Sequence, residues 1–192
     1  LAKISVTLLF TVLTLAVLNL MSCSSSRIDR SENATTTMTN MDNDIKSLML
    51  QLDATSASLN EISRAGQTNI RKAYDEYSLN VILITEMEKA FSKHADEMKS
   101  RGKDYFTEWQ KDDGKYKNKR IQSLSEQRRT DLEVIYRRIA ECSIGVKESF
   151  KNYLSNLKEI QIFLSNDLTA IGIESIDSIS KEAVMDGSSL KY

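Results

Sequence analysis

Apolar side chains recur along most of the chain at alternating steps of three and four residues. In the first long segment they run from Ile45 to Trp109, and the stripe shifts phase once, around Gly66. Steps of three and four place side chains on one face of an α-helix, as in the seam of a coiled coil or a helical bundle. The pattern therefore predicts one helix over residues 42–113, about 105 Å long at 1.5 Å per residue, with a bend at Gly66 or Gly102.

A second apolar stripe follows a polar turn and is as regular as the first. It predicts a turn over residues 114–120 and a helix over residues 121–165, and a weaker stripe after a polar break predicts a third helix over residues 168–186. Short connections make consecutive helices antiparallel neighbours. The expected fold is all-α: a long antiparallel helical hairpin, coiled-coil-like, whose third, shorter helix packs back onto it or extends it. The second stripe consists of Ile121, Leu124, Leu132, Ile135, Ile139, Cys142, Val146, Phe150, Tyr153, Leu157, Ile160 and Leu164.

A mainly apolar run, from residue 4 to residue 20, precedes these helices. Lys3 supplies a positive charge before it and the small residue Ser22 stands immediately before Cys23, which is the order of a signal peptide. The sequence Leu-Met-Ser-Cys that ends at Cys23 resembles the lipobox of bacterial lipoproteins. That resemblance implies that residues 1–22 are removed and that Cys23 carries the lipid anchor. The alternative is an uncleaved N-terminal anchor helix, for which the run is short.

Residues 23–41 contain few large apolar side chains and many hydroxyl and amide groups. Such groups compete with the backbone for hydrogen bonds, so this segment is predicted to be a flexible tether between the lipidated cysteine and a folded body at residues 42–192. In Gram-negative bacteria an aspartate directly after the lipidated cysteine favours retention in the inner membrane, and Ser24 is not that signal. We therefore expect a protein of the bacterial cell envelope, anchored in the outer membrane and facing the periplasm.

Composition and charge narrow the fold and the partners. The chain contains no proline and only six glycines, which favours long uninterrupted helices over folds that need frequent turns. Its net charge is −1, so no global field attracts a polyanion, and we expect no nucleic-acid partner. With Cys23 lipidated, Cys142 has no partner for an internal disulfide, and its place on the apolar stripe predicts a small core residue.

Chemistry-bearing residues do not form a recognised catalytic or metal-binding pattern. His94 is the one histidine, and without a partner for a triad or a multi-histidine metal site it is expected to be exposed and unpartnered. The acidic pairs lack calcium-loop spacing, and the glycines are scattered instead of gathered in a phosphate-binding loop. The sequence therefore predicts a protein that is not an enzyme, with no catalytic residues, no metal site and no cofactor.

One local bias of charge lies around the turn between the two long helices. Residues 111–138 carry nine Lys or Arg against five Asp or Glu, with aromatic residues close by. Such a surface suits an acidic envelope protein, a cell-wall polymer or acidic lipid headgroups, whereas the simpler interpretation is a solvated face with ion pairs to the facing helix. The candidate contact residues at this tip are Trp109, Tyr116, Lys117, Lys119 and Arg120.

The same region carries a family resemblance. Residues 105–139, YFTEWQKDDGKYKNKRIQSLSEQRRTDLEVIYRRI, and residues 163–175, FLSNDLTAIGIES, resemble an uncharacterised family of bacterial envelope lipoproteins catalogued as a domain of unknown function. The most specific features are the spacing from Phe106 to Trp109 and the two arginine pairs that follow. The resemblance implies a lipid-anchored, coiled-coil-rich envelope protein and carries no activity with it.

Two functions are compatible with these observations. The first is a lipid-anchored, non-enzymatic envelope protein of structural or protein-interaction type, bound to the membrane through Cys23, whose hairpin reaches away from the membrane and presents the basic tip. The alternative is a periplasmic ligand-binding helical bundle, for which Arg128, in line with the apolar stripe, is the one hint. The sequence leaves both the partner and homo-oligomerisation open.

Overall fold

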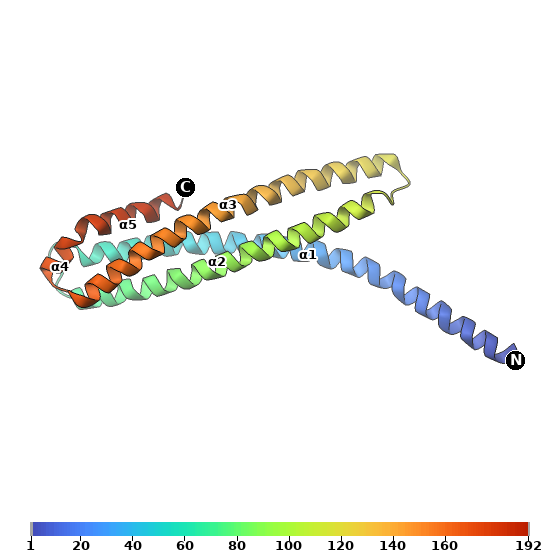
Figure 1. The fold of residues 1–192 in the computed structure, drawn as a ribbon, viewed down its shortest axis with the longest axis horizontal. Helices are drawn as coiled ribbons and strands as arrows, with labels where there is room; N and C mark the ends of the chain where they lie inside the picture. Colours follow the sequence, from blue (N-terminus) through green and yellow to red (C-terminus); the bar gives the residue numbers. More distant parts are fainter. Residues whose placement is uncertain (1, 192) are drawn as a thin grey trace.

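The computed structural model describes the backbone of residues 2–191 and the side chains of residues 27–191. Three long helices lie along one another, α1 (Ala2–Ile62), α2 (Ile70–Asp113) and α3 (Lys119–Asn166), and α2 runs antiparallel to both α1 and α3 (Figure 1). Two short helices, α4 (Ala170–Ser175) and α5 (Asp177–Ser189), then fold back, and α5 packs against α1 and α3. The prediction of an all-α fold, with an antiparallel hairpin and a shorter helical segment after it, is confirmed, and the shorter segment folds back.

The prediction of one helix over residues 42–113 is wrong, because the chain reverses direction at residues 63–69. Gly66 has a φ of +77°, in the left-handed region that favours glycine, and no other residue in the described part of the chain has a positive φ. Asn69 then caps α2, its side-chain oxygen accepting a hydrogen bond of 3.0 Å from the Lys72 backbone N–H. The phase shift in the apolar stripe therefore marks a turn between two antiparallel helices, whereas α2 continues through Gly102.

The prediction of a flexible tether over residues 23–41 is wrong for residues 27–41, which belong to α1. Ala34, Thr37 and Met41 are buried in the same three-and-four spacing that leads on to Leu48. Their polar groups are satisfied inside the helix: the Thr37 hydroxyl donates to the Ala34 carbonyl at 2.8 Å. The predicted signal peptide, Cys23 and the first residues of the predicted tether lie outside the residues whose side chains are described.

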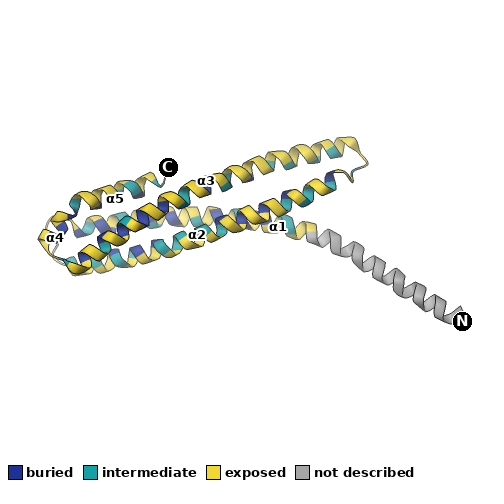
Figure 2. Ribbon diagram, viewed as in Figure 1, coloured by how far each residue is buried: buried dark blue, intermediate teal, exposed yellow. Residues whose placement is uncertain are grey.

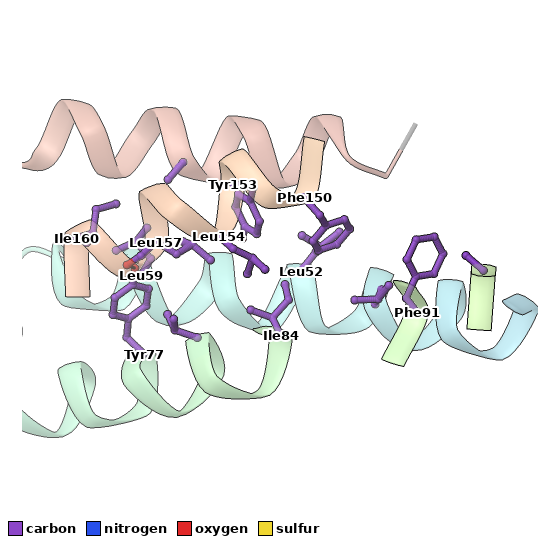
Figure 3. Close-up of a cluster of buried hydrophobic side chains, with 14 of the residues drawn as sticks. Leu52, Leu59, Tyr77, Ile84, Phe91, Phe150, Tyr153, Leu154, Leu157 and Ile160 are labelled. Atoms are coloured by element: carbon purple, nitrogen blue, oxygen red, sulfur yellow. Dashed lines mark hydrogen bonds between the residues drawn. The ribbon is translucent and has the colours of Figure 1, made fainter. Parts of the chain in front are cut away.

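The apolar core lies between the three long helices and is densest in the half of the molecule nearest α4 (Figures 2 and 3). Tyr77 of α2 is fully buried there, and its hydroxyl donates a hydrogen bond of 2.7 Å to the Leu157 carbonyl of α3. Burial raises the pKa of Tyr77 above its ordinary value. Within the described part of the chain, no helix is both long enough and apolar enough to cross a membrane.

Helix α5 closes only this half of the bundle. It presents the small buried residues Ser180, Ala183 and Gly187, and it ends where Leu190 and Lys191 border an open apolar groove between α1 and α3. Beyond that point α5 no longer covers the apolar stripe of α3: Leu132, Ile139 and Val146 are only partly buried against the core, and Cys142 is exposed, so its prediction as a core residue is wrong. The stripe is apolar in sequence along its whole length, but its residues are fully buried only from Phe150 onward.

Candidate functional site

The candidate site lies at one end of the molecule, which we call the hairpin end and define as residues 27–31 of α1 together with residues 105–129. It contains the end of α2, the turn after it and the start of α3, and these lie beside residues 27–31 of α1 (Figure 1). The sequence analysis places this turn at the end far from the membrane anchor. The structure places it at the same end as Arg27, four residues after Cys23, so that expectation is wrong.

A buried ion pair fastens the hairpin end together. Asp113, the last residue of α2, is 6% exposed and accepts a hydrogen bond of 2.9 Å from Nε of Arg129 on α3. The Ser125 hydroxyl donates to the other Asp113 carboxylate oxygen at 2.9 Å and accepts from Nε1 of Trp109 at 2.8 Å. The Asp113 carboxylate thereby joins α2 to two successive turns of α3, and the turn between the helices is held rigidly.

Two of the sequence-predicted contact residues belong to this fastening. Trp109 is half-buried, and its ring packs against Tyr105 with a centroid distance of 5.4 Å. Tyr116 is also half-buried, with its hydroxyl 3.4 Å from the Ser125 hydroxyl. Their positions are therefore structural, and only an edge of each side chain is left to meet a partner.

The other three predicted contact residues are exposed. Neither Lys117 nor Arg120 makes an ion pair with a described residue, and Lys119 bonds to the neutral side-chain oxygen of Gln122 at 3.0 Å. Ile121 and Leu124 follow on the first turns of α3 and are 49% and 59% exposed. The hairpin end thus presents cations without ion-pair partners beside apolar side chains that are about half exposed.

An ion pair joins Arg27 of α1 to the end of α2. Nε of Arg27 lies 3.0 Å from a carboxylate oxygen of Asp112, which also accepts a hydrogen bond from Lys115. The pKa of Asp112 lies below its ordinary value, first because of the Lys115 hydrogen bond and then because of the Arg27 charge. A shallow cavity of about 330 Å³ opens beside this contact, lined by Arg30, Tyr105 and Trp109 among others. The sequence analysis missed residues 27–31 because it assigned them to the tether.

The contact between Arg27 and Asp112 is expected to weaken in acid. A lowered folded-state pKa means that the carboxylate stabilises the folded chain above the ordinary value of 3.8, and that this stabilisation is lost as the pH falls through the lowered value. Solvent screens the pair, so its contribution is about 1 kcal/mol or less. Asp112→Asn should therefore show a smaller fall in Tm than the wild type when the pH is lowered from about 5 to about 3. Equal falls in the two proteins would contradict the assignment.

The remaining candidates for chemistry lie elsewhere. His94 was expected to be exposed and unpartnered, but it is half-buried and its Nδ1 lies 2.6 Å from the Asp44 carboxylate, which joins α2 to α1. Arg128 is exposed, and its neighbour Arg129 is the one that points inward. Among residues 27–191, no three His, Cys, Asp or Glu side chains gather as metal ligands.

Comparison with known sequences identifies one family. The family described as protein of unknown function (DUF2959) matches residues 26–190. No curated protein and no solved structure matches the chain. The match includes residues 26–41, most of the segment predicted as a tether, which agrees with the packing of residues 27–41 into the bundle.

Proposed function

The chain belongs to the DUF2959 family of proteins of unknown function, and on this premise we propose that it is a lipid-anchored, non-enzymatic protein of the bacterial cell envelope. It would be attached through Cys23 to the outer membrane, face the periplasm, and act in a structural or protein-interaction role. The Leu-Met-Ser-Cys sequence supports the anchor. The absence of a catalytic pattern in the sequence supports a role that does not depend on a reaction.

The observation that carries the proposal is the contact between Arg27 and Asp112. It ties the start of the folded body to the hairpin end, so a lipid on Cys23 would hold that end at the membrane. Helix α2 has 44 residues and is therefore about 66 Å long. The turn at residues 63–69 and α4 lie at the opposite end (Figure 1). An anchor at Cys23 would let the bundle present this far end to partners away from the lipid surface.

The two ends of the bundle differ in charge: the hairpin end, which would lie at the membrane, is basic, and the far end is acidic. Residues 27–31 and 105–124 carry seven basic residues against four acidic ones. At the far end, residues 61–69 and 166–177 carry one basic residue against four acidic ones. The basic end faces an anionic lipid surface in the proposed orientation, and the acidic end faces away from it.

The alternative of a ligand-binding bundle loses its sequence support in the structure. Such a bundle needs polar groups that converge inside an apolar seam, and Arg128 was the one residue expected to supply one. It is exposed instead, and the half-buried Arg129 is already paired with Asp113 at 2.9 Å. The structural or interaction role is therefore the better supported of the two.

Replacing Cys23 tests the anchor directly. In cells given a radiolabelled fatty acid, Cys23→Ser is expected to take up no label and to leave the membrane fraction, because the thiol that carries the lipid is gone. The matched control is Cys142→Ser, which removes the other cysteine and should remain labelled and membrane-bound. Label on the Cys23→Ser protein would show that the lipid is attached elsewhere or that the lipobox assignment is wrong.

A further inference from the structure

We propose that the hairpin end rests on anionic phospholipid headgroups of the leaflet that holds the Cys23 lipid. Lys117, Lys119 and Arg120 make the charged contacts, and Ile121 and Leu124 enter the interface beside them. This inference rests on the proposed anchor at Cys23. It goes beyond the anchor because it assigns a ligand to the hairpin end and a fixed orientation to the bundle, which the lipid alone would leave free to tilt.

Chain length places the hairpin end within reach of the membrane. Arg27 is four residues after Cys23, and whatever the conformation of this stretch it spans at most about 14 Å. Arg27 is in turn in contact with Asp112, one residue before the end of α2, at 3.0 Å. The surface potential of an anionic leaflet falls off within a Debye length of about 8–10 Å. The turn after α2 therefore lies at or near the zone in which lipid charge is felt.

The charges available for such a contact are those that the protein leaves uncompensated. Of the acidic residues at the hairpin end, Glu108, Asp112 and Asp113 are each paired with a cation of that end. The other two, Asp29 and Glu126, are exposed and make no ion pair with a described residue. Lys117, Lys119 and Arg120 make no ion pair with any described residue. Each basic residue close to an anionic leaflet adds to the attraction, so three of them bias the orientation of the protein once the lipid has confined it to the surface.

Apolar exposure at the same place distinguishes a lipid interface from a merely solvated basic face. Ile121 is 49% exposed and Leu124 is 59% exposed, and a spacing of three residues puts them on one side of α3. Ile28 of α1, also at the hairpin end, is 59% exposed. Basic side chains beside exposed aliphatic ones are the combination found in segments that lie in the headgroup region.

The test uses the lipidated full chain purified from membranes and reconstituted into vesicles. One set of vesicles contains only phosphatidylethanolamine and phosphatidylcholine, and a second set also contains phosphatidylglycerol. Trp109 is the sole tryptophan and lies at the hairpin end, so its fluorescence reports that end without a label. Quenching by a lipid with a headgroup-level quencher is expected in the phosphatidylglycerol vesicles, and it should disappear at about 1 M salt, where the Debye length is about 3 Å.

The variant Lys117→Glu, Lys119→Glu, Arg120→Glu should reduce the quenched fraction of Trp109 at least about fivefold. The control variant Arg138→Glu, Lys151→Glu, Lys158→Glu also reverses three positive charges, at exposed positions of α3 farther from the hairpin end. Its Trp109 should be quenched as in the wild type. Flotation with the neutral vesicles checks the anchor separately. Protein that floats but is not quenched in the phosphatidylglycerol vesicles would overturn this inference and leave the anchor standing, whereas wild-type protein that does not float would overturn both.

Discussion

Replacing Gly102 with alanine is expected to lower the free energy of unfolding by about 2–3 kcal/mol, which corresponds to a fall in Tm of about 4–12 °C for a chain of this size. The sign is opposite to the usual one, since alanine in a helix interior is about 1 kcal/mol more favourable than glycine. The reason is the neighbour of Gly102 on α3. A Cβ atom at this position would overlap Cε1 and Cδ1 of the Tyr136 ring.

The Tyr136 ring cannot move aside without losing contacts. It is buried, and it meets Phe106 edge-on at a centroid distance of 5.5 Å. Its hydroxyl donates to the Ala34 carbonyl at 3.1 Å and lies 2.8 Å from the Thr37 hydroxyl, so one side chain of α3 passes Gly102 of α2 and reaches α1. Overpacking costs about 1–3 kcal/mol and a lost buried hydrogen bond costs about 1 kcal/mol more.

Thermal unfolding of the chain without residues 1–22 measures this effect, and two comparisons isolate its cause. Gly145→Ala on α3 is the matched control, because a Cβ atom there would meet nothing within 4 Å, and it should raise stability by about 0.5–1 kcal/mol. In a Tyr136→Ala background the obstacle is gone, and Gly102→Ala should become stabilising. If Gly102→Ala raises the Tm of the wild type, the close approach of the two helices is wrong.

The same tyrosine explains why the start of α1 could not be read from the sequence. Ala34, Thr37 and Met41 continue the spacing of Leu48, but an alanine and a threonine carry little weight in an apolar pattern. Ala34 and Thr37 are buried because their small side chains allow Tyr136 to come close, and that depends on where α3 lies. A segment rich in hydroxyl groups was therefore predicted to be a tether, although the hydroxyls of Thr35, Thr37 and Thr39 each donate to a backbone carbonyl of α1.

The turn at Gly66 was visible in the sequence but could be interpreted in two ways. The phase shift, the glycine and the capping residue Asn69 are compatible with a bend in one helix and with a reversal between two. The choice depends on tertiary packing: Leu59 and Tyr77, on either side of the turn, face each other in the core (Figure 3). Periodicity identified both helices and left their relative direction undecided.

The stripe of α3 shows the opposite error, in which an apolar pattern predicts burial that the fold does not provide. Phe150 and Leu157 are buried, as expected, because α2 and α5 pack against α3. Ile121, Leu124 and Ile135 belong to the same stripe and are about half exposed. Only the tertiary arrangement shows that α5 ends before it can cover them. The hairpin end was accordingly located by its basic residues, while its apolar residues were assigned to the core.

Replacing Asp113 with alanine is expected to lower the free energy of unfolding by about 2–4 kcal/mol, because it removes the buried partner of Arg129 and leaves this mostly buried cation only the exposed carboxylate of Glu133, at 3.5 Å. The side chains of Asp113 and Arg129 are only 8% and 15% exposed. The Ser125 hydroxyl also loses its acceptor, and with it the fixed orientation in which it accepts from Trp109. The emission of Trp109 should therefore shift to longer wavelength as water reaches the loosened ring.

Denaturant unfolding followed by Trp109 emission measures both effects in one experiment. Asp131→Ala removes an exposed carboxylate of α3 that has no ion pair among the described residues, and as the matched control it should change stability by less than about 0.5 kcal/mol. Adding Arg129→Met to Asp113→Ala should recover part of the loss, since an apolar side chain of similar length removes the charge that has lost its buried partner. This recovery separates two possible causes of the lost stability. If the cause is the Arg129 cation without its buried partner, Arg129→Met restores stability, whereas it does not if α2 has merely lost its last polar residue. The absence of recovery would therefore show that the ion pair does not hold the hairpin end together.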